Sequence, residues 1–393
     1  RKADFLRRRR FLTPAAKYFH CCSVWRVCTI CEQRAAGPAP RLFAKGKERM
    51  NRDVLHVPTF IDSRPISGTQ YVIVVLCGLV MFLDGFDTQS ASYIAPVLAK
   101  EWSISPALLG PIFSSALLGL MVGYLVLSPL SDRYGHRRLI LLSTAMFGLL
   151  TLVTVFAAAV SQLLVLRFLT GVALGAAIPS TIAITTEFSP KRLRASLVLA
   201  IYCGFSLGFV AAGAAAASLI PTFGWRSLLW VGAVAPIGLA ILIYAYLPES
   251  IDFLIRTKIG NSHIWHTLKR LDPSLVVRAS GTFSTDVEES RSAIASLFQA
   301  DRAVGTVVLW VVFGLNLALF YALQSWLPSI LSGLGYPPST VATTTSITTV
   351  GGIVAAFVVG PAMDRLGPYG SLATLYFVGV FFMIMMGYAV YGS

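Results

Sequence analysis

Two aspartates stand three residues apart inside a long apolar stretch. Asp84 and Asp87 belong to FLDGFD, within YVIVVLCGLVMFLDGFDTQSASYIAPVL. Residues at i and i+3 project from nearly the same helix face, and an ionised Asp at the bilayer centre costs about 2.5–3.5 kcal/mol. Two adjacent carboxylates oppose each other's ionisation. The pair predicts a site that handles a proton or an ionic substrate. The alternative is a pair satisfied by Gln89, Ser90 or a neighbouring helix, without a functional role.

Arg167 is a cation in another apolar stretch, LLVLRFLTG. It could bind a substrate carboxylate or pair with an aspartate of FLDGFD. The alternative is an arginine that extends its head group to the membrane interface, since only about six residues separate it from the outer loop. Glu187, at the other end of this stretch, is expected to pair with the basic segment SPKRLRA rather than to bind protons.

Polar and aromatic side chains interrupt a third apolar stretch, FGLNLALFYALQSWLP. They are Asn316, Tyr321, Gln324 and Trp326. Aromatic faces combined with amide groups suit an aromatic ring that bears hydroxyls. Asn316 is the strongest candidate, because it lies nearest the middle of the membrane. Trp326 could instead be an interfacial anchor, and Tyr321 could serve packing alone.

An Asp-Arg-x-Gly motif occurs twice, in LSDRYGHRR and in AMDRLGPYG. The residues concerned are Asp132, Arg133, Gly135, Arg137 and Arg138 in the first copy, and Asp364, Arg365 and Gly367 in the second. Asp132 could accept hydrogen bonds from the first N–H groups of the next helix and pair with basic neighbours, while Gly135 permits a tight turn. We expect a latch that breaks and re-forms during a conformational change. The alternative is charge that only fixes the topology.

Long apolar segments alternate with short polar ones after residue 68. The sequence is 55% hydrophobic and 13% charged, about half the charged fraction of a soluble domain. Segments of about 20 apolar residues cross a hydrocarbon core of about 30 Å. Nine spans are expected, at about 69–96, 106–128, 138–158, 161–186, 195–219, 226–247, 303–328, 338–362 and 369–391. The sequence therefore predicts an all-α polytopic membrane protein.

Lys and Arg gather in every second loop, which sets the orientation of the spans. The basic loops follow the second, fourth, sixth and eighth spans, whereas the loops on the other side hold only Lys100 and Arg226. We expect the N-terminus and the loop after the sixth span to be cytoplasmic. The membrane is expected to be the inner membrane of a bacterium.

The chain divides into two related parts. The expected organisation is a cytoplasmic leader at 50–68, a six-helix bundle at 69–247, a central loop at 248–302 and a partial second bundle at 303–393. Repeated halves joined by a cytoplasmic loop are typical of transporters whose site lies between the halves. A second half matching the first would have six spans, so we expect nine of twelve helices in a C-terminally truncated sequence.

Residues 1–49 differ from the rest in composition. They contribute +10 of the net charge of +14 and four of the six cysteines, so the charge gives little support for nucleic-acid binding. Polar residues interrupt the apolar stretch that an export signal requires. Cys28 and Cys31 have no second pair nearby to complete a zinc site. We expect this head to be upstream sequence, with Met50 as the native start, and no metal site.

From about Ile61 to its end the sequence resembles the major facilitator superfamily, and within it the aromatic acid:proton symporter family. The motifs are LDGFD, SDRYGHRR, RFLTGVALGAAIPSTIAITTEFSPKRLRA, LPES and SWLP. The resemblance implies a fold of two helical bundles and uptake of benzoate- or hydroxybenzoate-type acids. The sequence departs from the family at Ser128, where glycine is usual, at Pro368-Tyr369, where a basic pair is common, and in lacking the last three spans.

The expected function is proton-coupled uptake of an aromatic carboxylate by alternating access, with the anion, protons and the lipid bilayer as partners. No phosphate-binding loop, HExxH or GxSxG motif indicates an enzyme, and no cofactor is expected. One alternative is a porter for another organic acid, or an exporter. The other is a non-transporting, truncated or sensory membrane protein. The sequence leaves the exact substrate and the oligomeric state open.

Overall fold

The computed structural model describes residues 54–391, apart from 258–260, 274, 276–281, 285–301 and 367. The expectations for residues 1–49 and for Met50 lie outside the described residues. The elements are β1 (Val54–His56), α1 (Val57–Asp62), α2 (Gly68–Glu101), η2 (Pro106–Leu108), α3 (Leu109–Val122), η3 (Gly123–Leu127), η4 (Ser128–Leu130), α4 (Ser131–Tyr134), α5 (His136–Val155), α6 (Val160–Glu187), α7 (Arg194–Phe223), α8 (Arg226–Tyr246), α9 (Ile251–Arg256), α10 (Asn261–Leu271), β2 (Thr282–Ser284), α12 (Arg302–Gly333), α13 (Pro338–Leu366) and α14 (Pro368–Tyr391).

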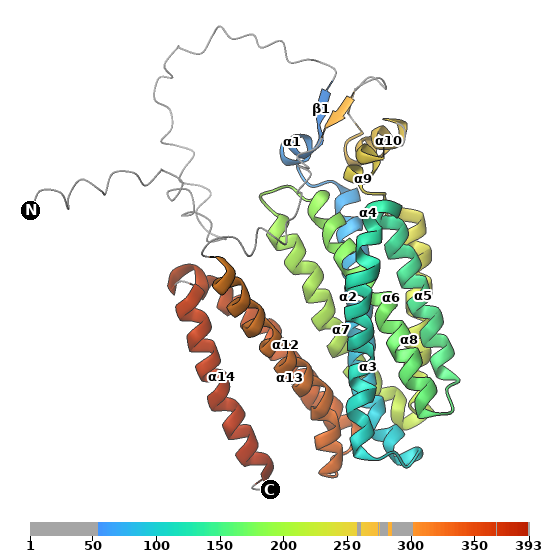
Figure 1. The fold of residues 1–393 in the computed structure, drawn as a ribbon, viewed down its shortest axis with the longest axis vertical. Helices are drawn as coiled ribbons and strands as arrows, with labels where there is room; N and C mark the ends of the chain where they lie inside the picture. The colour runs from blue at the N-terminus through green and yellow to red at the C-terminus, as the bar shows by residue number, and fades with distance from the viewer. Residues whose placement is uncertain are drawn as a thin grey trace, which may run out of the picture. The chain divides into compact units, whose positions relative to one another are not determined.

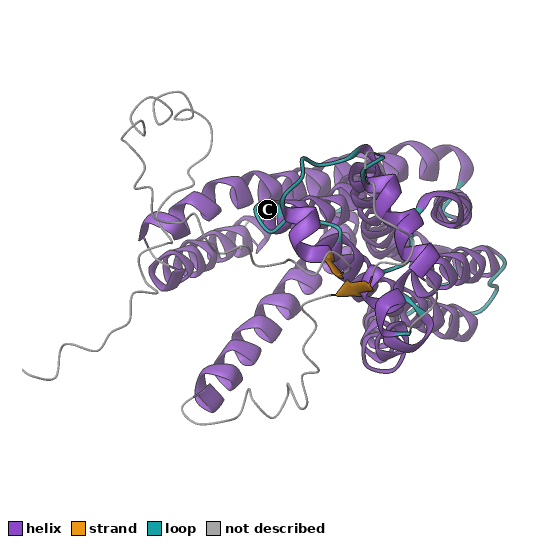
Figure 2. Ribbon diagram, turned by 90° about the horizontal axis from the view of Figure 1, so that it is seen from above, coloured by secondary structure: helices purple, strands orange, loops and turns teal. Residues whose placement is uncertain are grey.

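Each of the nine expected spans corresponds to a long helix (Figure 1). Within the described residues, seven helices are long and apolar enough to cross a membrane. In α14 the apolar stretch Gly370–Met385 is shorter. Ser and Thr side chains fill much of the first half of α13 and lower its hydropathy. Helices dominate the view in Figure 2, with two short strands beside them.

The chain forms two compact units. Residues 51–354 make up one of them, which contains α2 to α8, all of α12 and most of α13. Residues from Ala355 onward belong to the second unit. Most described side chains of α14, in that second unit, are exposed. All the contacts that form the candidate site lie within the first unit.

Three pairs of glycines, Gly119/Gly123, Gly171/Gly175 and Gly204/Gly208, have the G-x-x-x-G spacing that predicts close packing of helices. A Cβ at Gly208 of α7 would lie 2.1 Å from the carbonyl oxygen of Phe82 in α2. A Cβ at Gly171 of α6 would lie 2.0 Å from the carbonyl oxygen of Ala116 in α3. Both distances exclude any side chain, so the prediction of close helix packing is confirmed. This packing brings α2, α3, α6 and α7 together around the candidate site.

The second expected span is less regular than an uninterrupted helix over 106–128. Regular α-helix ends at Val122, a wide π-type turn spans Gly123–Leu127, and a tight 3₁₀ turn spans Ser128–Leu130. Pro129 has no N–H to continue the α-helical hydrogen bonds. Such wide turns often occur at functional sites, and this one carries Tyr124, which lines the cavity described below.

Part of the central loop is folded. Helix α9 begins with Ser250 as its N-cap, whose side chain accepts a hydrogen bond from the Phe253 N–H. Strand β2 pairs in parallel with β1, Val54 opposite Thr282. Helix α10 is tied to the start of α2 because the Thr69 hydroxyl donates to the Arg270 carbonyl at 2.8 Å. The sequence analysis predicted only a polar loop here.

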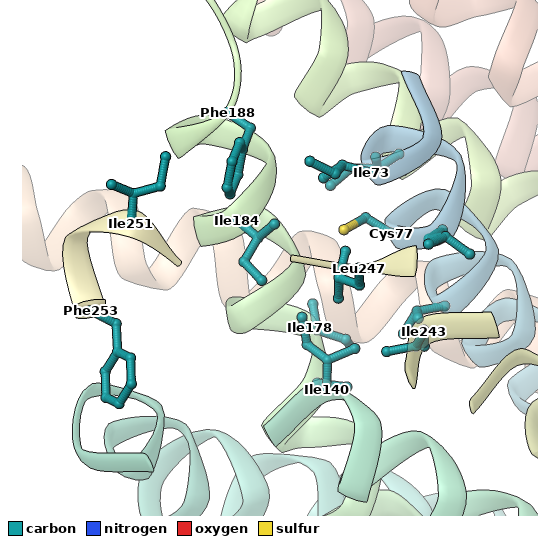
Figure 3. Packing of buried hydrophobic residues seen from close by; sticks show 14 of the residues in the cluster. Ile73, Cys77, Ile140, Ile178, Ile184, Phe188, Ile243, Leu247, Ile251 and Phe253 are labelled. Atoms are coloured by element: carbon teal, nitrogen blue, oxygen red, sulfur yellow. The ribbon is translucent and has the colours of Figure 1, made fainter. Parts of the chain in front are cut away.

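A buried apolar cluster joins α9 to the membrane-spanning helices. Figure 3 shows Ile251 beside Ile184 of α6 and beside Phe188, the residue that follows α6, with Ile73 of α2 across from them. Ile251, Ile184 and Ile73 are fully buried. At about 25 cal/mol per Å² of apolar area removed from water, such side chains contribute about 1.5–3 kcal/mol each. The cluster fixes the ends of these helices nearest α9 relative to one another.

Candidate functional site

Asp87 of α2 and Arg167 of α6 form a buried ion pair. One guanidinium nitrogen, Nη1, donates to both carboxylate oxygens of Asp87, at 2.9 Å and 2.8 Å. Both side chains are only 5% exposed. Of the roles considered for Arg167, the structure therefore places it in a pair with a first-span aspartate, and its head group does not extend to the interface.

The pair is costly to keep and costly to break. Removing two charges from water carries a desolvation penalty of several kcal/mol per ion, which attraction and hydrogen bonds offset only in good geometry. Removing one partner leaves an uncompensated charge, which costs about 3–5 kcal/mol. The pair can therefore separate without this cost only if another anion replaces Asp87 or a proton neutralises it.

Asp84 lies one turn before Asp87 but has no matching partner. It is 2% exposed, and among the described residues its Oδ1 atom has no hydrogen-bond partner. A buried polar atom is normally hydrogen-bonded, so an orphaned carboxylate oxygen marks a place where a donor is missing. The two acids share a helix face, as predicted, yet they occupy different environments.

A large cavity of about 890 Å³ lies beside Asp84. Its wall is mostly aromatic and aliphatic, with Phe113 from α3, Phe205 from α7 and Phe320 from α12. The polar groups on the wall are Asp84, Ser114, Tyr124, Tyr202, Tyr321, Ser325 and Trp326. No Lys, Arg or His is among the described residues of this wall. The cavity is suited to an aromatic molecule, but an anion within it has to find its cation elsewhere.

A second, much smaller cavity of about 30 Å³ leads to that cation. It is lined by Asp87 and Arg167, and it shares Asp84, Tyr321 and Ser325 with the large cavity. About one water molecule fits a space of this size. The ion pair therefore lies directly behind a wall that faces the large cavity.

The predicted residues of α12 divide into two groups. Tyr321 and Trp326 line the large cavity, and Trp326 packs edge-to-face on Phe113 with ring centroids 5.7 Å apart. Gln324 instead donates to the Thr349 hydroxyl of α13 at 3.0 Å. Asn316 is exposed and is not among the residues that line either cavity.

Polar contacts join α2 to α12 and α13 at a point that follows Asp87 along α2. The Gln89 side chain donates to the Gln324 carbonyl at 3.5 Å. Beyond it, a Cβ at Gly213 of α7 would lie 2.1 Å from the Ser346 hydroxyl and 2.9 Å from the Tyr93 hydroxyl. No sequence pattern predicts this contact, which depends on how α7 and α13 cross.

The first Asp-Arg-x-Gly turn is organised by a residue that sequence reasoning passed over. The Arg137 N–H, near the start of α5, donates to Glu249 Oε1 at 3.0 Å, and no side chain caps α5 from its N-cap position. The expectation that Asp132 caps this helix is therefore wrong. Asp132 instead lies 3.8 Å from Arg256 of α9, with both side chains half exposed. The LPES motif, which contains Glu249, was the available signal.

Gly135 is required at this turn for two reasons. Its φ of +96° is disfavoured for other residues, and a Cβ there would lie 2.6 Å from Glu249 Oε2. Burial raises the pKa of Glu249 above the usual glutamate value, opposed by the Arg137 N–H and by the positive charges of Arg137 and Arg138.

The remaining loop residues are less constrained. Arg133 and Arg138 are exposed, and Arg137 Nη2 donates to the Tyr244 carbonyl at 2.6 Å. Gly367 and the side chains of Asp364 and Arg365 lie outside the described residues. Glu187 does not show the expected pairing with the basic loop. Its Oε1 atom accepts the Asp252 N–H at 2.8 Å, near the N-terminus of α9.

Comparison with known proteins identifies the family. Residues 77–393 match the Major Facilitator Superfamily. The chain belongs to the major facilitator superfamily. It is 38% identical over 336 residues to the 4-hydroxybenzoate transporter PcaK of Pseudomonas putida, covering 85% of this chain and 75% of that one. It is 35% identical over 333 residues to a gallate transporter of the same species, covering 85% and 74%.

Solved structures agree on the fold. The partially occluded, inward-open xylose transporter XylE from E. coli aligns with a TM-score of 0.57 at 16% identity, over 76% of this chain and 74% of that one. At this identity the likeness shows the fold alone. Together with the relatives, it shows that this member of the major facilitator superfamily is an integral membrane transporter of the aromatic acid branch and not an enzyme.

Proposed function

We propose that the protein takes up an aromatic carboxylate together with protons, by alternating access between two helical bundles. The similarity to transporters of 4-hydroxybenzoate and gallate supports an aromatic acid as substrate. The large, mostly aromatic cavity supports the same class, because ligand sites of this kind are apolar with a few placed polar groups. The substrate cavity lies among α2, α3, α7 and α12.

One observation carries the proposal: the buried Asp87–Arg167 pair behind the wall of the large cavity. A proton that binds a carboxylate oxygen of Asp87 removes its charge and weakens its two hydrogen bonds to Arg167. Among the described residues, Arg167 is the only cation that lines either cavity. It is then available to the substrate carboxylate. Proton and anion therefore bind together, and the neutral combination crosses between the two access states.

The orientation of the protein in the membrane follows, in this proposal, from the distribution of charge. Every second loop is basic, which supports a cytoplasmic N-terminus and central loop in a bacterial inner membrane. The first Asp-Arg-x-Gly turn would serve as the cytoplasmic latch. Asp132 and Arg256 lie at a distance of 3.8 Å and are exposed, so this contact can break at little cost when the bundles rock. Asp364, Arg365 and Gly367 would form its counterpart.

The test is uptake of labelled 4-hydroxybenzoate into proteoliposomes with an acidic exterior. The pH gradient should drive accumulation in the native protein, and Asp87→Asn should abolish accumulation against the gradient. Asp62→Asn is a matched control, because Asp62 lies on α1 and accepts the Lys191 N–H outside the cavities. Full accumulation by Asp87→Asn would sink the proposed coupling.

The same assay separates two other possibilities. Preference for an aliphatic acid over 4-hydroxybenzoate in competition would indicate a porter for another organic acid. Accumulation of label inside the liposomes that is driven by an acidic interior would indicate exchange of the anion for a proton, as in an exporter. The aromatic wall of the cavity favours an aromatic substrate over an aliphatic one.

A further inference from the structure

Asp84 is the one acid of the cavity wall that the coupling mechanism leaves unused. Asp87 has both of its oxygens on Arg167. Asp84 Oδ1, by contrast, is buried and lacks a partner among the described residues, while the side chain faces both cavities. A carboxyl oxygen accepts hydrogen bonds. The Asp84 side chain lines the cavity, so a donor that approaches from the cavity meets its carboxyl group.

Two tyrosines accompany Asp84. Tyr124, on the π-type turn after α3, and Tyr321, on α12, line the large cavity together with Asp84. A phenol hydroxyl can donate and accept, so all three side chains can hydrogen-bond to a ligand in the cavity. Most of the remaining wall, including Phe113 and Phe320, is apolar.

The spacing of the two acids sets a length. Side chains at i and i+3 of a helix have Cβ atoms about 5–6 Å apart, which is also roughly the distance from a carboxyl carbon to a para oxygen across a benzene ring. A substrate carboxylate that takes the place of Asp87 at Arg167 would therefore bring a para substituent to the level of Asp84. A meta substituent on the same ring is directed to one side.

We propose that Asp84, Tyr124 and Tyr321 form a subsite that reads a hydroxyl group para to the substrate carboxylate. The inference rests on the proposed function and deepens it. The hydroxyl donates to the Asp84 carboxyl group where it lines the cavity and exchanges a hydrogen bond with a tyrosine. Benzoate fills the same cavity but leaves the buried carboxylate without a donor, and a site built for a hydroxyl discriminates against an analogue that lacks it.

The experiment is a set of dissociation constants, measured by calorimetry on the purified protein in nanodiscs at one fixed pH. The probes are 4-hydroxybenzoate, 3-hydroxybenzoate, 4-methoxybenzoate and benzoate. Because 4-methoxybenzoate accepts but does not donate, it tests the direction of the hydrogen bond. The native protein should bind 4-hydroxybenzoate at least about 10-fold more tightly than benzoate or 4-methoxybenzoate, with 3-hydroxybenzoate in between.

The variants assign this preference to the three side chains. Asp84→Leu, which keeps the branched shape and removes both oxygens, should reduce the ratio of the two affinities to near one while benzoate still binds. Tyr321→Phe and Tyr124→Phe should lower the same ratio by a smaller factor. Tyr71→Phe is the matched control, because Tyr71 is 56% exposed near the start of α2, and it should leave the ratio unchanged.

The outcomes are distinct. Equal native affinities for benzoate and 4-hydroxybenzoate, or equal losses for both probes in Asp84→Leu and in the tyrosine variants, would overturn the subsite and leave the proposed function standing. Failure of the native protein to bind any of the four aromatic acids would overturn the proposed function and the subsite with it.

Discussion

At the scale of single residues, the site depends on two acids that differ only in what lies opposite them. Asp87 meets Arg167, and Asp84 meets a cavity. Both lie on one face of α2, so the difference comes from the depth at which α6 presents Arg167. Asp87 is therefore suited to bind a proton in place of its ion pair with Arg167. Asp84 is suited to receive a hydrogen bond from a ligand.

Breaking the buried pair from one side should destabilise the protein more than removing it altogether. Arg167→Gln leaves the Asp87 carboxylate buried without its cation, which we expect to cost about 3 kcal/mol or more. The double variant Asp87→Asn/Arg167→Gln leaves no charge behind and should regain most of that loss. Thermal unfolding in detergent measures both. A double variant no more stable than the single one would contradict the pairing.

Glu249 should make stability depend on pH. Burial raises its pKa in the folded protein above the unfolded value, so folding favours the protonated form. Its contribution is fully favourable below the ordinary glutamate pKa of about 4.3 and is lost as the pH rises through the folded value. Glu249→Gln keeps an acceptor for the Arg137 N–H and should gain stability relative to the native protein as the pH rises. Unfolding temperatures across this range give the difference.

The residue types could be read from the sequence, but their assignments could not. Asp84, Asp87 and Arg167 were predicted because a charge in an apolar stretch is an anomaly that demands a partner. Which aspartate holds Arg167 depends on the rotation and depth of α6, which no spacing encodes. Glu249 was passed over as a site residue because its partner is a backbone N–H, 112 positions away in the chain, and such contacts leave no pattern in side chains.

At the scale of elements, glycine determines where helices meet. The G-x-x-x-G spacings predicted close packing, and the contacts of Gly171 and Gly208 confirm it. The wide turn at Gly123–Leu127 and the pairing of β1 with β2 were not predicted. A three-residue parallel pair between segments over 200 positions apart is fixed by the helices that carry it, and its own sequence is too short to specify it.

The contact of α7 with α13 should open during transport. A Cβ at Gly213 would lie 2.1 Å from the Ser346 hydroxyl, so cysteines at both positions have the short Cβ separation that a disulfide needs. Oxidation of Gly213→Cys/Ser346→Cys should therefore cross-link the two helices and stop uptake into proteoliposomes, and a reducing agent should restore it. The single variant Ser346→Cys is the control. Full uptake by the cross-linked protein would show that these helices do not separate.

At the scale of the whole molecule, the proposed mechanism links two equilibria. If a proton on Asp87 frees Arg167 for the substrate, the bound anion must strengthen proton binding by the same factor. The long helices could be predicted from the sequence because apolar length is a local property. The linkage could not, because it requires knowing that Arg167 already has a partner.

The linkage predicts that aromatic anions bind more tightly as the pH falls. Between about pH 6 and 8, where 4-hydroxybenzoate keeps its carboxylate ionised, the affinity should rise by up to about 10-fold per pH unit for one coupled proton. Calorimetry in two buffers of different ionisation enthalpy should then register the uptake of up to about one proton per anion. Asp87→Asn resembles the protonated state, so its affinity should be independent of pH and at least equal to that of the native protein at low pH. Asp62→Asn should keep the native dependence. An affinity in the native protein that does not change with pH would separate proton binding from substrate binding, and Arg167 would then have to receive its anion without releasing Asp87.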